Sequence, residues 1–417
     1  MSRRLDRRRR NAPDVRYDRL VTIGTPLHER TAPLNRKQNW REWSGYLAAS
    51  SYDYLHVHEY TGIRHAAVLI DVSPLYKYAI LGRDATRLID RVITRDATKI
   101  KPGQVIYTPW CDDHGKVVDD GTIARLDDDS YRWTSAEQHL RWFELNARGL
   151  DVHVEDISET TAAIALQGPL SRKVLQAATG EDWTDLGYYR RRPAVIGDIQ
   201  IDVSRTGYTG DLGYELWVDA RQGVPLWDRL MEFGRPFGIR PAGMLALDMA
   251  RLEAGLILIE VDYTSSERAL APEQNYSPFE IGLGRLVNLG KQADFVGKRA
   301  LLAEQQAGGP SRRLVGLEID WTAIDQLYEE QDLPIHVPGA AWREQVPVYA
   351  GGRQVGRSTS GTWSPTLKKH IALASVEPRY ETPGTRVAFE WTVEGRRGRA
   401  AATVVPLPFF EPPRKRE

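Results

Sequence analysis

Hydrophobic residues recur along this chain with two different periods, and the change of period separates predicted helices from predicted strands. Residues 82–94 repeat apolar side chains every three or four positions after Asp84, which predicts a helix capped by that aspartate. Residues 104–135 instead alternate and are interrupted at 113–115 and 127–129 by turn-forming residues, which predicts three strands. Helices and strands are therefore expected within one unit.

A similar order of elements recurs from residue 160 onward. Residues 160–180 predict a buried strand, a Gly-Pro turn and a helix that ends at Gly180, and residues 224–234 and 242–255 predict two more helices. This recurrence indicates a duplicated α+β unit rather than a Rossmann sheet. Beyond a linker at residues 304–313, short runs with glycine turns predict a small C-terminal β-barrel.

The aromatic segment at residues 20–60 is expected to mix helix and loop. Together with the other patterns it gives three expected regions. Residues 1–20 are a basic, disordered tail, residues 21–310 hold two subdomains divided near residue 155, and residues 311–417 form the barrel.

Composition narrows the class of protein without identifying it. The 417 residues carry 56 basic and 56 acidic side chains, so the chain as a whole has no electrostatic footprint for nucleic acid. No apolar stretch is long enough to span a membrane, and the basic start lacks the apolar region of a secretory signal. Cys111 is the only cysteine, which excludes a disulfide framework and fits a reducing cytoplasm.

Several common chemistries lack their sequence patterns. No glycine-rich phosphate loop for a dinucleotide or ATP is present, and no nucleophile elbow supports a hydrolase. His56 and His58 stand two apart with no third ligand near them in sequence, so we expect no metal site.

Two neighbouring acids in "GKVVDDGTI" are candidates for chemistry. Strand alternation predicts Val117 and Asp119 on one face and Val118 and Asp120 on the other. Placing two carboxylates in an apolar strand pair costs free energy unless they are hydrogen-bonded or functional. One of them could cap the turn before Gly121, while the other could project into a cavity and stabilise a cationic centre.

A third acid, Glu215, lies in "SRTGYTGDLGYELWV". It shares a strand face with Trp217, and a carboxylate beside an indole suits a flat heterocycle with N–H donors. A salt bridge to Arg205 or Arg251 is an equally good explanation from the sequence. The regularly spaced glycines are expected to let the chain turn closely past a flat ligand.

The ordered motifs of residues 60–405 resemble the glycine cleavage T-protein (aminomethyltransferase) family. They include "GQVIYTPWCDDHGKVVDDGTI", "IALQGP", "SRTGYTGDLGYEL", "ALDMARLEAG", "SPFEIGLGRLV" and "STSGTWSPTLKKHIALASV". The resemblance implies an α+β, three-domain cloverleaf around tetrahydrofolate, with two related folate-binding subdomains and a small C-terminal β-barrel. It implies transfer of a one-carbon unit from a small donor to N5 of the folate, whose amine attacks an electrophilic carbon while a nearby carboxylate stabilises positive charge.

The resemblance also assigns roles to particular residues. Asp119 matches the catalytic aspartate beside N5, and Glu215 matches the acid that grips the pterin. The other residues that it places at or near the folate are Tyr107, Tyr208, Arg251, Glu253 and Leu75, of which Leu75 stands where the family often has methionine.

Departures from the T-protein pattern leave the donor open. Leu247 and Arg285 replace an expected arginine and tryptophan, and "YTSSERALAPEQNY" is an insertion. These features resemble tetrahydrofolate-dependent demethylases, which move a methyl group from O, S or N, although such relatives often lack the catalytic aspartate. Candidates for a donor cavity in that case are Trp40, Trp43, Tyr46, Trp110 and Trp133. A non-catalytic folate-binding protein is a further alternative, and docking of a lipoylated carrier protein is left open.

Overall fold

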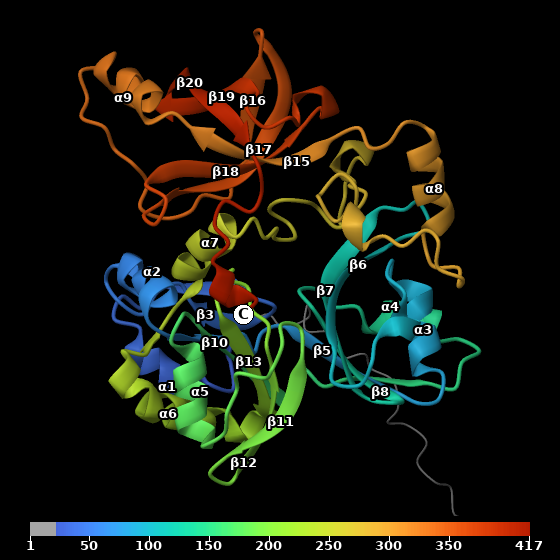
Figure 1. The fold of residues 1–417 in the computed structure, drawn as a ribbon. Coiled ribbons are helices and arrows are strands. Elements are labelled where there is room, and N and C mark those ends of the chain that lie inside the picture. The colour runs from blue at the N-terminus through green and yellow to red at the C-terminus, as the bar shows by residue number, and fades with distance from the viewer. Residues whose placement is uncertain (1–21) are drawn as a thin grey trace, which may run out of the picture.

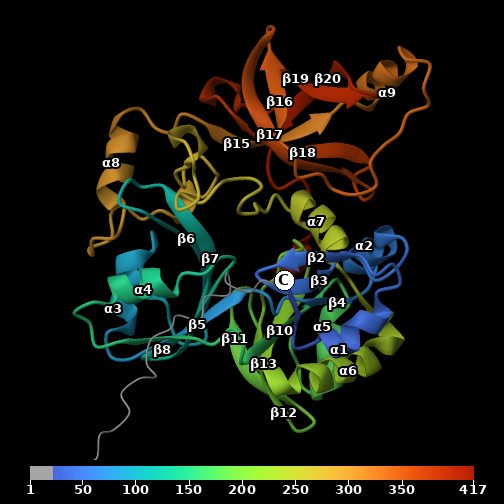
Figure 2. The same ribbon diagram turned by 180° about the vertical axis from the view of Figure 1, so that it is seen from behind.

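A computed structural model describes residues 22–417, so the basic tail expected at residues 1–20 lies outside the described residues. The chain forms three lobes that meet at a common junction, with the barrel above two sheet-containing lobes (Figure 1). The view from behind shows the same arrangement (Figure 2). This confirms the α+β fold with a small C-terminal β-barrel.

The first lobe is built on a six-stranded sheet in the order β11-β12-β13-β10-β4-β14. Its strands are β4 (Val68–Asp71), β10 (Thr161–Gln167), β11 (Arg191–Ile196), β12 (Ile199–Ser204), β13 (Gly213–Asp219) and β14 (Arg240–Pro241). One face packs on α5 (Ser171–Thr179), α6 (Gly223–Gly234) and Leu27, which directly precedes α1 (His28–Thr31). The other face packs on α2 (His56–His65) and α7 (Met244–Glu253). The centre of the sheet is therefore buried on both faces, whereas Val195 in the edge strand β11 is exposed.

The second lobe is an antiparallel sheet in the order β6-β7-β8-β5-β9. Its strands are β5 (Tyr76–Leu81), β6 (Val105–Cys111), β7 (Val117–Asp127), β8 (Ser130–Ser135) and β9 (His153–Asp156). They pack on α3 (Ala85–Val92) and α4 (Leu140–Asn146). Asp84 stands at the N-cap of α3 as predicted, but its carboxylate accepts from Asp151 N and Arg87 rather than from a helix N–H, so the expected cap bond is absent.

The chain passes between these two sheets twice. β4 pairs with β10 in the first lobe, whereas β5, which follows after only residues 72–75, pairs with β8 in the second. The chain returns to the first sheet at β10, after residues 157–160. A single division near residue 155 therefore does not describe how the two sheets are assembled, because the residues before β5 belong with those after β9.

The third lobe is a closed barrel in the order β15-β18-β17-β16-β19-β20. Its strands are β15 (Arg313–Ile319), β16 (Val346–Ala350), β17 (Arg353–Ser364), β18 (Lys369–Val376), β19 (Arg386–Val393) and β20 (Arg396–Val405), with α9 (Trp321–Glu329) inserted between β15 and β16. The helix α8 (Lys298–Gln306) occupies the start of the expected linker, which leaves only residues 307–312 as the connection to β15.

The aromatic segment contains strands that the sequence analysis did not predict. β1 (Ile23–Gly24), β3 (Tyr46–Ala49) and β2 (Trp40–Trp43) form a three-stranded sheet in that order. The hairpin between β2 and β3 turns through Ser44 and Gly45, both with positive φ (50° and 80°), as a tight hairpin turn of the favoured hand requires. The expectation of helix and loop alone was wrong here, because strands of four residues are too short to show a clear alternation of apolar and polar residues.

Candidate functional site

A β-bulge in β7 decides which of the two neighbouring acids faces the junction. Trp110 pairs with Asp119 but Cys111 pairs with Val117, so Val118 is an extra residue in the ladder. Val118 and Asp119 consequently both face the core of the second lobe, while Val117 and Asp120 face the other way. The predicted alternation was wrong at this point, because a bulge shifts the two-residue period by one.

Asp119 is fully buried inside the second lobe. Its carboxylate accepts hydrogen bonds from Asp120 N (2.7 Å), Glu137 N (3.1 Å) and the Nε2 of His139 (3.0 Å). The His139 ring lies edge-on to Trp110, 5.4 Å between ring centroids. Asp119 thus stabilises the segment that follows β8, and its position in this core does not favour the direct ligand contact predicted for it.

Asp120 is half-buried and lies on the junction side of β7. Tyr107 donates a hydrogen bond to its Oδ2 (2.7 Å) and Tyr263 donates one to its Oδ1. Burial and the charge of Asp119 raise the pKa of Asp120 to about 7, and the two tyrosine hydroxyls oppose that rise. A carboxylate in this position changes protonation state close to neutral pH.

Two of the predicted ligand-contacting residues, Tyr107 and Tyr208, lie near Asp120. Tyr107 holds it directly, and the Asp120 charge contributes to the raised pKa of Tyr208, which burial dominates. The hydroxyl of Tyr208 donates to the carbonyl of Ile257. Leu75 and Tyr208 both pack, half-buried, against the apolar cluster that contains Met244. The structure therefore brings Tyr107, Tyr208 and Leu75 to the junction together.

Arg251 and Glu253 hold elements together instead of offering free surface. Arg251 is fully buried and pairs with Asp262 (2.6 Å), which also accepts from two hydroxyls of barrel strand β17. Glu253 is fully buried and accepts from Tyr60, Arg64 and Ser364. Both side chains therefore tie α7 to neighbouring elements of the junction.

Glu215 lies half-buried at the junction end of β13. Thr206 donates a hydrogen bond to its Oε2 (2.5 Å). Burial raises the pKa of Glu215, while the Thr206 hydroxyl and the charge of Arg132 oppose that rise. Within the described residues it forms no ion pair with Arg205 or Arg251, which donate to carbonyl groups and to Asp262 respectively. The salt-bridge explanation of Glu215 is therefore not realised.

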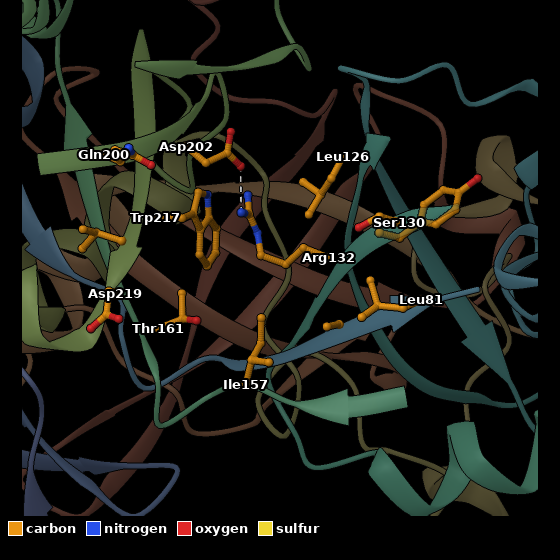
Figure 3. A pocket seen from close by; sticks show the side chains of 13 residues that line it. Leu81, Leu126, Ser130, Arg132, Ile157, Thr161, Gln200, Asp202, Trp217 and Asp219 are labelled. Atoms are coloured by element: carbon orange, nitrogen blue, oxygen red, sulfur yellow. Dashed lines mark hydrogen bonds and ion pairs between the residues drawn. The ribbon is translucent and has the colours of Figure 1, made fainter. Parts of the chain in front are cut away.

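A small cavity of about 280 Å³ lies between the two sheets beyond Glu215. Figure 3 shows Arg132 of β8 and Trp217 of β13 side by side in its wall. The Arg132 guanidinium lies 4.2 Å from the Trp217 ring centroid and pairs with Asp202 (2.7 Å). Arg132 of the second lobe thus covers the Trp217 ring, and its positive charge also opposes the rise that burial causes in the pKa of the Glu215 carboxylate.

The glycines of "GYTGDLGYE" accommodate protein groups and not a ligand. A Cβ at Gly207 or Gly213 would lie about 2 Å from the Gln167 amide, and one at Gly210 would meet the Ala254 side chain at 2.3 Å. Gln167 donates to the carbonyls of Thr206 and Tyr214 and accepts from Thr209. The glycines therefore let this loop wrap one buried glutamine, which fixes the approach to Glu215.

Some residues at the junction were missed or misplaced by the sequence analysis. Tyr263 lies in the segment treated only as an insertion, yet its hydroxyl contacts Asp120. Trp110 and Trp133, considered for a donor cavity, are fully buried in the core of the second lobe. The signal for Tyr263 was an aromatic residue directly after Asp262 in an otherwise polar loop, which by itself predicts nothing specific.

The arrangement has a definite chemical capacity. Two half-buried carboxylates on facing lobes, Asp120 and Glu215, each accept a hydrogen bond from a hydroxyl group. Besides burial, the charge of Asp120 contributes to the raised pKa of Tyr107, and the charge of Glu215 contributes to that of Tyr189. Carboxylates held in this way accept N–H groups of a heterocycle or stabilise a developing positive charge. Within residues 22–417, no group of three or more His, Cys, Asp and Glu residues could hold a metal ion, and no helix is long and apolar enough to cross a bilayer.

These features define a class: a three-lobed α+β protein whose polar site lies where two sheets and a barrel meet. The chain belongs to the glycine cleavage T-protein family, because the GCVT N-terminal domain family model matches residues 27–291 and the glycine cleavage T-protein C-terminal barrel domain matches residues 312–411. The family is folate-dependent and includes aminomethyltransferases.

Named relatives agree with this assignment. The chain is 36% identical over 395 residues to an aminomethyltransferase of Moorella thermoacetica, covering 94% of this chain and 98% of that protein. It is 35% identical over 412 residues to a trimethylamine-oxide aldolase of Ruegeria pomeroyi, where it spans 95% of this chain but only 48% of the relative. This chain thus corresponds to about half of that longer protein.

A solved structure shows the same fold. The glycine cleavage system aminomethyltransferase T from Bartonella henselae superimposes with a TM-score of 0.78 at 24% identity, covering 93% of this chain and 98% of the other. The likeness confirms the fold that the motifs predicted.

Proposed function

We propose that the protein is a tetrahydrofolate-dependent one-carbon transferase that moves a C1 unit from a small donor to the folate. The observation that carries the proposal is the pair of half-buried carboxylates, Asp120 and Glu215, held at the junction of a folate-dependent fold. When bound, tetrahydrofolate supplies a nucleophilic secondary amine at N5.

The residues present fit such a ligand by their donor and acceptor chemistry. Glu215 accepts one hydrogen bond from Thr206 and keeps accessible surface, so it has acceptor capacity for neighbouring N–H groups of a pterin. Leu75 and Tyr208 offer half-buried apolar surface at the junction, as a flat ring requires. Tyr107 and Tyr263 fix the Asp120 carboxylate from both oxygens.

We assign the charge-stabilising role to Asp120 and a positioning role to Asp119. Asp120 is ionised above pH 7, and in that form it stabilises positive charge on the transferred carbon or accepts a proton. Asp119 supports it through the bond from Asp120 N. The catalytic role that the resemblance implied for Asp119 is thereby proposed for the next residue, Asp120.

The relatives favour a donor whose one-carbon group is bonded to nitrogen. Two relatives, an aminomethyltransferase and a trimethylamine-oxide aldolase, have names that refer to one-carbon groups bonded to nitrogen. We therefore propose methylene-level transfer from an N-bonded carbon, with or without a lipoylated carrier protein. Demethylation that yields 5-methyl-tetrahydrofolate is the competing reaction.

Identification of the folate product tests the proposal. The protein is incubated with tetrahydrofolate and panels of aminomethyl, N-methyl, O-methyl and S-methyl donors, with and without a lipoylated carrier. Formation of 5,10-methylene-tetrahydrofolate is expected, whereas 5-methyl-tetrahydrofolate would establish demethylation instead. Absence of tetrahydrofolate binding by calorimetry would refute both.

A further inference from the structure

A second cavity, of about 630 Å³, lies outside the junction. It opens between the start of β7, the segment at residues 272–280 and barrel strands β17 and β18. None of the residues assigned to the folate site lines it. Its charged lining consists of the cations Lys116, Arg312 and Arg357 and the carboxylates Glu273, Glu280 and Glu377, and its neutral polar lining includes Asn275, Gln354 and Ser375.

The cavity wall holds polar atoms that the described part of the chain leaves without partners. The Nε of Arg357, the Oγ of Ser375 and the Oδ1 of Asn275 are buried and make no hydrogen bond there. Ser375 is 3% exposed, and it stands directly opposite Arg357 in the β17–β18 ladder. A buried donor without a partner destabilises the folded protein, so two adjacent ones indicate a missing acceptor.

Of the three carboxylates in the lining, Glu273 is exposed, and Glu280 and Glu377 are engaged by other residues. Glu280 accepts from Ser277 N (2.9 Å) and Ser311 (2.7 Å) and pairs with Arg312 (3.4 Å). Glu377 accepts from Arg353 through both oxygens (2.5 and 2.7 Å). Arg357 has no ion pair among residues 22–417, and its one hydrogen bond goes to the hydroxyl of Tyr276.

We propose that the Arg357–Ser375 corner of this cavity binds a small anion that carries a carboxylate or phosphate group. An anionic oxygen can accept from the Nε–H of Arg357 and from the Ser375 hydroxyl at once, and charge-assisted bonds to a guanidinium are the stronger kind. Lys116 and Arg312 also line the cavity, but both pair with Glu280 (3.8 and 3.4 Å), which leaves Arg357 as the lining cation without an ion pair within residues 22–417.

The proposed anion site is connected to β7, the strand that carries Asp120. Val117 N donates to Tyr276 O (2.8 Å), so the segment that meets Arg357 also pairs with β7, three residues before Asp120. Tyr276 therefore connects Arg357 to β7, and an anion bound at Arg357 should raise the thermal stability of the protein because it binds only the folded state.

Calorimetry on the full chain tests this proposal with inorganic phosphate and succinate as separate probes. We expect saturable binding of at least one probe with a Kd of about 1 mM or tighter, a rise in Tm with the same probe, and affinity reduced about 10-fold or more in Arg357→Gln. The matched control is Arg399→Gln, an exposed barrel arginine, which should bind as the wild type does.

The two probes separate the sources of the anion, because binding of phosphate alone indicates a phosphate compound and binding of succinate alone a carboxylate. Ser375→Ala serves as the second variant if Arg357→Gln does not fold, and it should also weaken binding. The proposal is refuted if neither probe binds at about 10 mM, or if the control loses as much affinity as the Arg357 variant. Folate binding is measured in parallel, so failure here leaves the proposed function untouched.

Discussion

The two faces of β7 hold adjacent carboxylates in opposite situations. On the core face, Asp119 is fully buried and three N–H donors surround it. On the junction face, Asp120 keeps accessible surface, receives two tyrosine hydroxyls and has a pKa raised to about 7. The carboxylate oxygens of Asp119 are thus satisfied by protein donors, whereas the carboxylate of Asp120 is available to a ligand.

The difference shows that a single inserted residue can assign structure and chemistry to neighbouring side chains of the same type. Without the bulge at Val118, strict alternation would give Asp119 the face of Val117, which is the junction face.

Asp120→Asn should lower kcat of the folate-dependent reaction about 100-fold or more, because the neutral amide cannot stabilise positive charge on the transferred carbon. Folate affinity should change by less than about threefold, since Asn keeps the size of the side chain and Glu215 is intact. Steady-state kinetics and calorimetry measure the two effects. Turnover within about twofold of wild type would remove Asp120 from the site.

Asp119→Asn should destabilise the protein by about 2–4 kcal/mol, because its amide cannot accept from all three donors that surround the carboxylate. Urea unfolding measures the loss, and Asp129→Asn, in the exposed β7–β8 turn, is the matched control with no expected change. A variant that is as stable as wild type but inactive would reverse the contrast and restore the direct role predicted for Asp119.

Glu215→Gln should weaken tetrahydrofolate binding about 10-fold or more, because charge-assisted hydrogen bonds from the ligand become neutral ones. Burial raises the pKa of Glu215, so folding disfavours its charged form, and the Gln variant should melt at or above the wild-type temperature near pH 8. Asp219→Asn, exposed on the same strand, is the control. A large loss of Tm with unchanged affinity would make Glu215 structural.

The sequence predicted more of the architecture than of the site, for identifiable reasons. The helix that ends at Gly180 and the strands at residues 105–135 follow from long, regular patterns, and α5 does end where Gly180 adopts a left-handed conformation. The crossing at residues 72–75 could not be predicted, because a Ser-Pro turn marks a break without saying which sheet the next strand joins.

The site was harder to predict because its assignments depend on contacts between distant segments. Glu215, Tyr107 and Tyr208 were carried over by motif, and the structure brings them to one junction. Asp120 was not preferred over Asp119, since a bulge leaves no signature in "VVDD". Tyr263 lies 143 positions from Asp120 in the chain, so only the fold reveals their contact.

Tyr263→Phe provides the finest test of the junction face. In the wild type, turnover should fall as pH drops below about 7, because protonation removes the Asp120 charge. The Tyr263 hydroxyl favours the ionised carboxylate, so its loss should raise the pKa of Asp120 and move the acid limb of the pH–rate profile upward by about 0.5–1 unit. Tyr349→Phe, whose hydroxyl donates to Glu390 on the barrel, should leave the limb in place. An unmoved or downward-shifted limb in Tyr263→Phe would show that Asp120 does not govern the pH dependence, since removing a donor can only make its carboxylate harder to ionise.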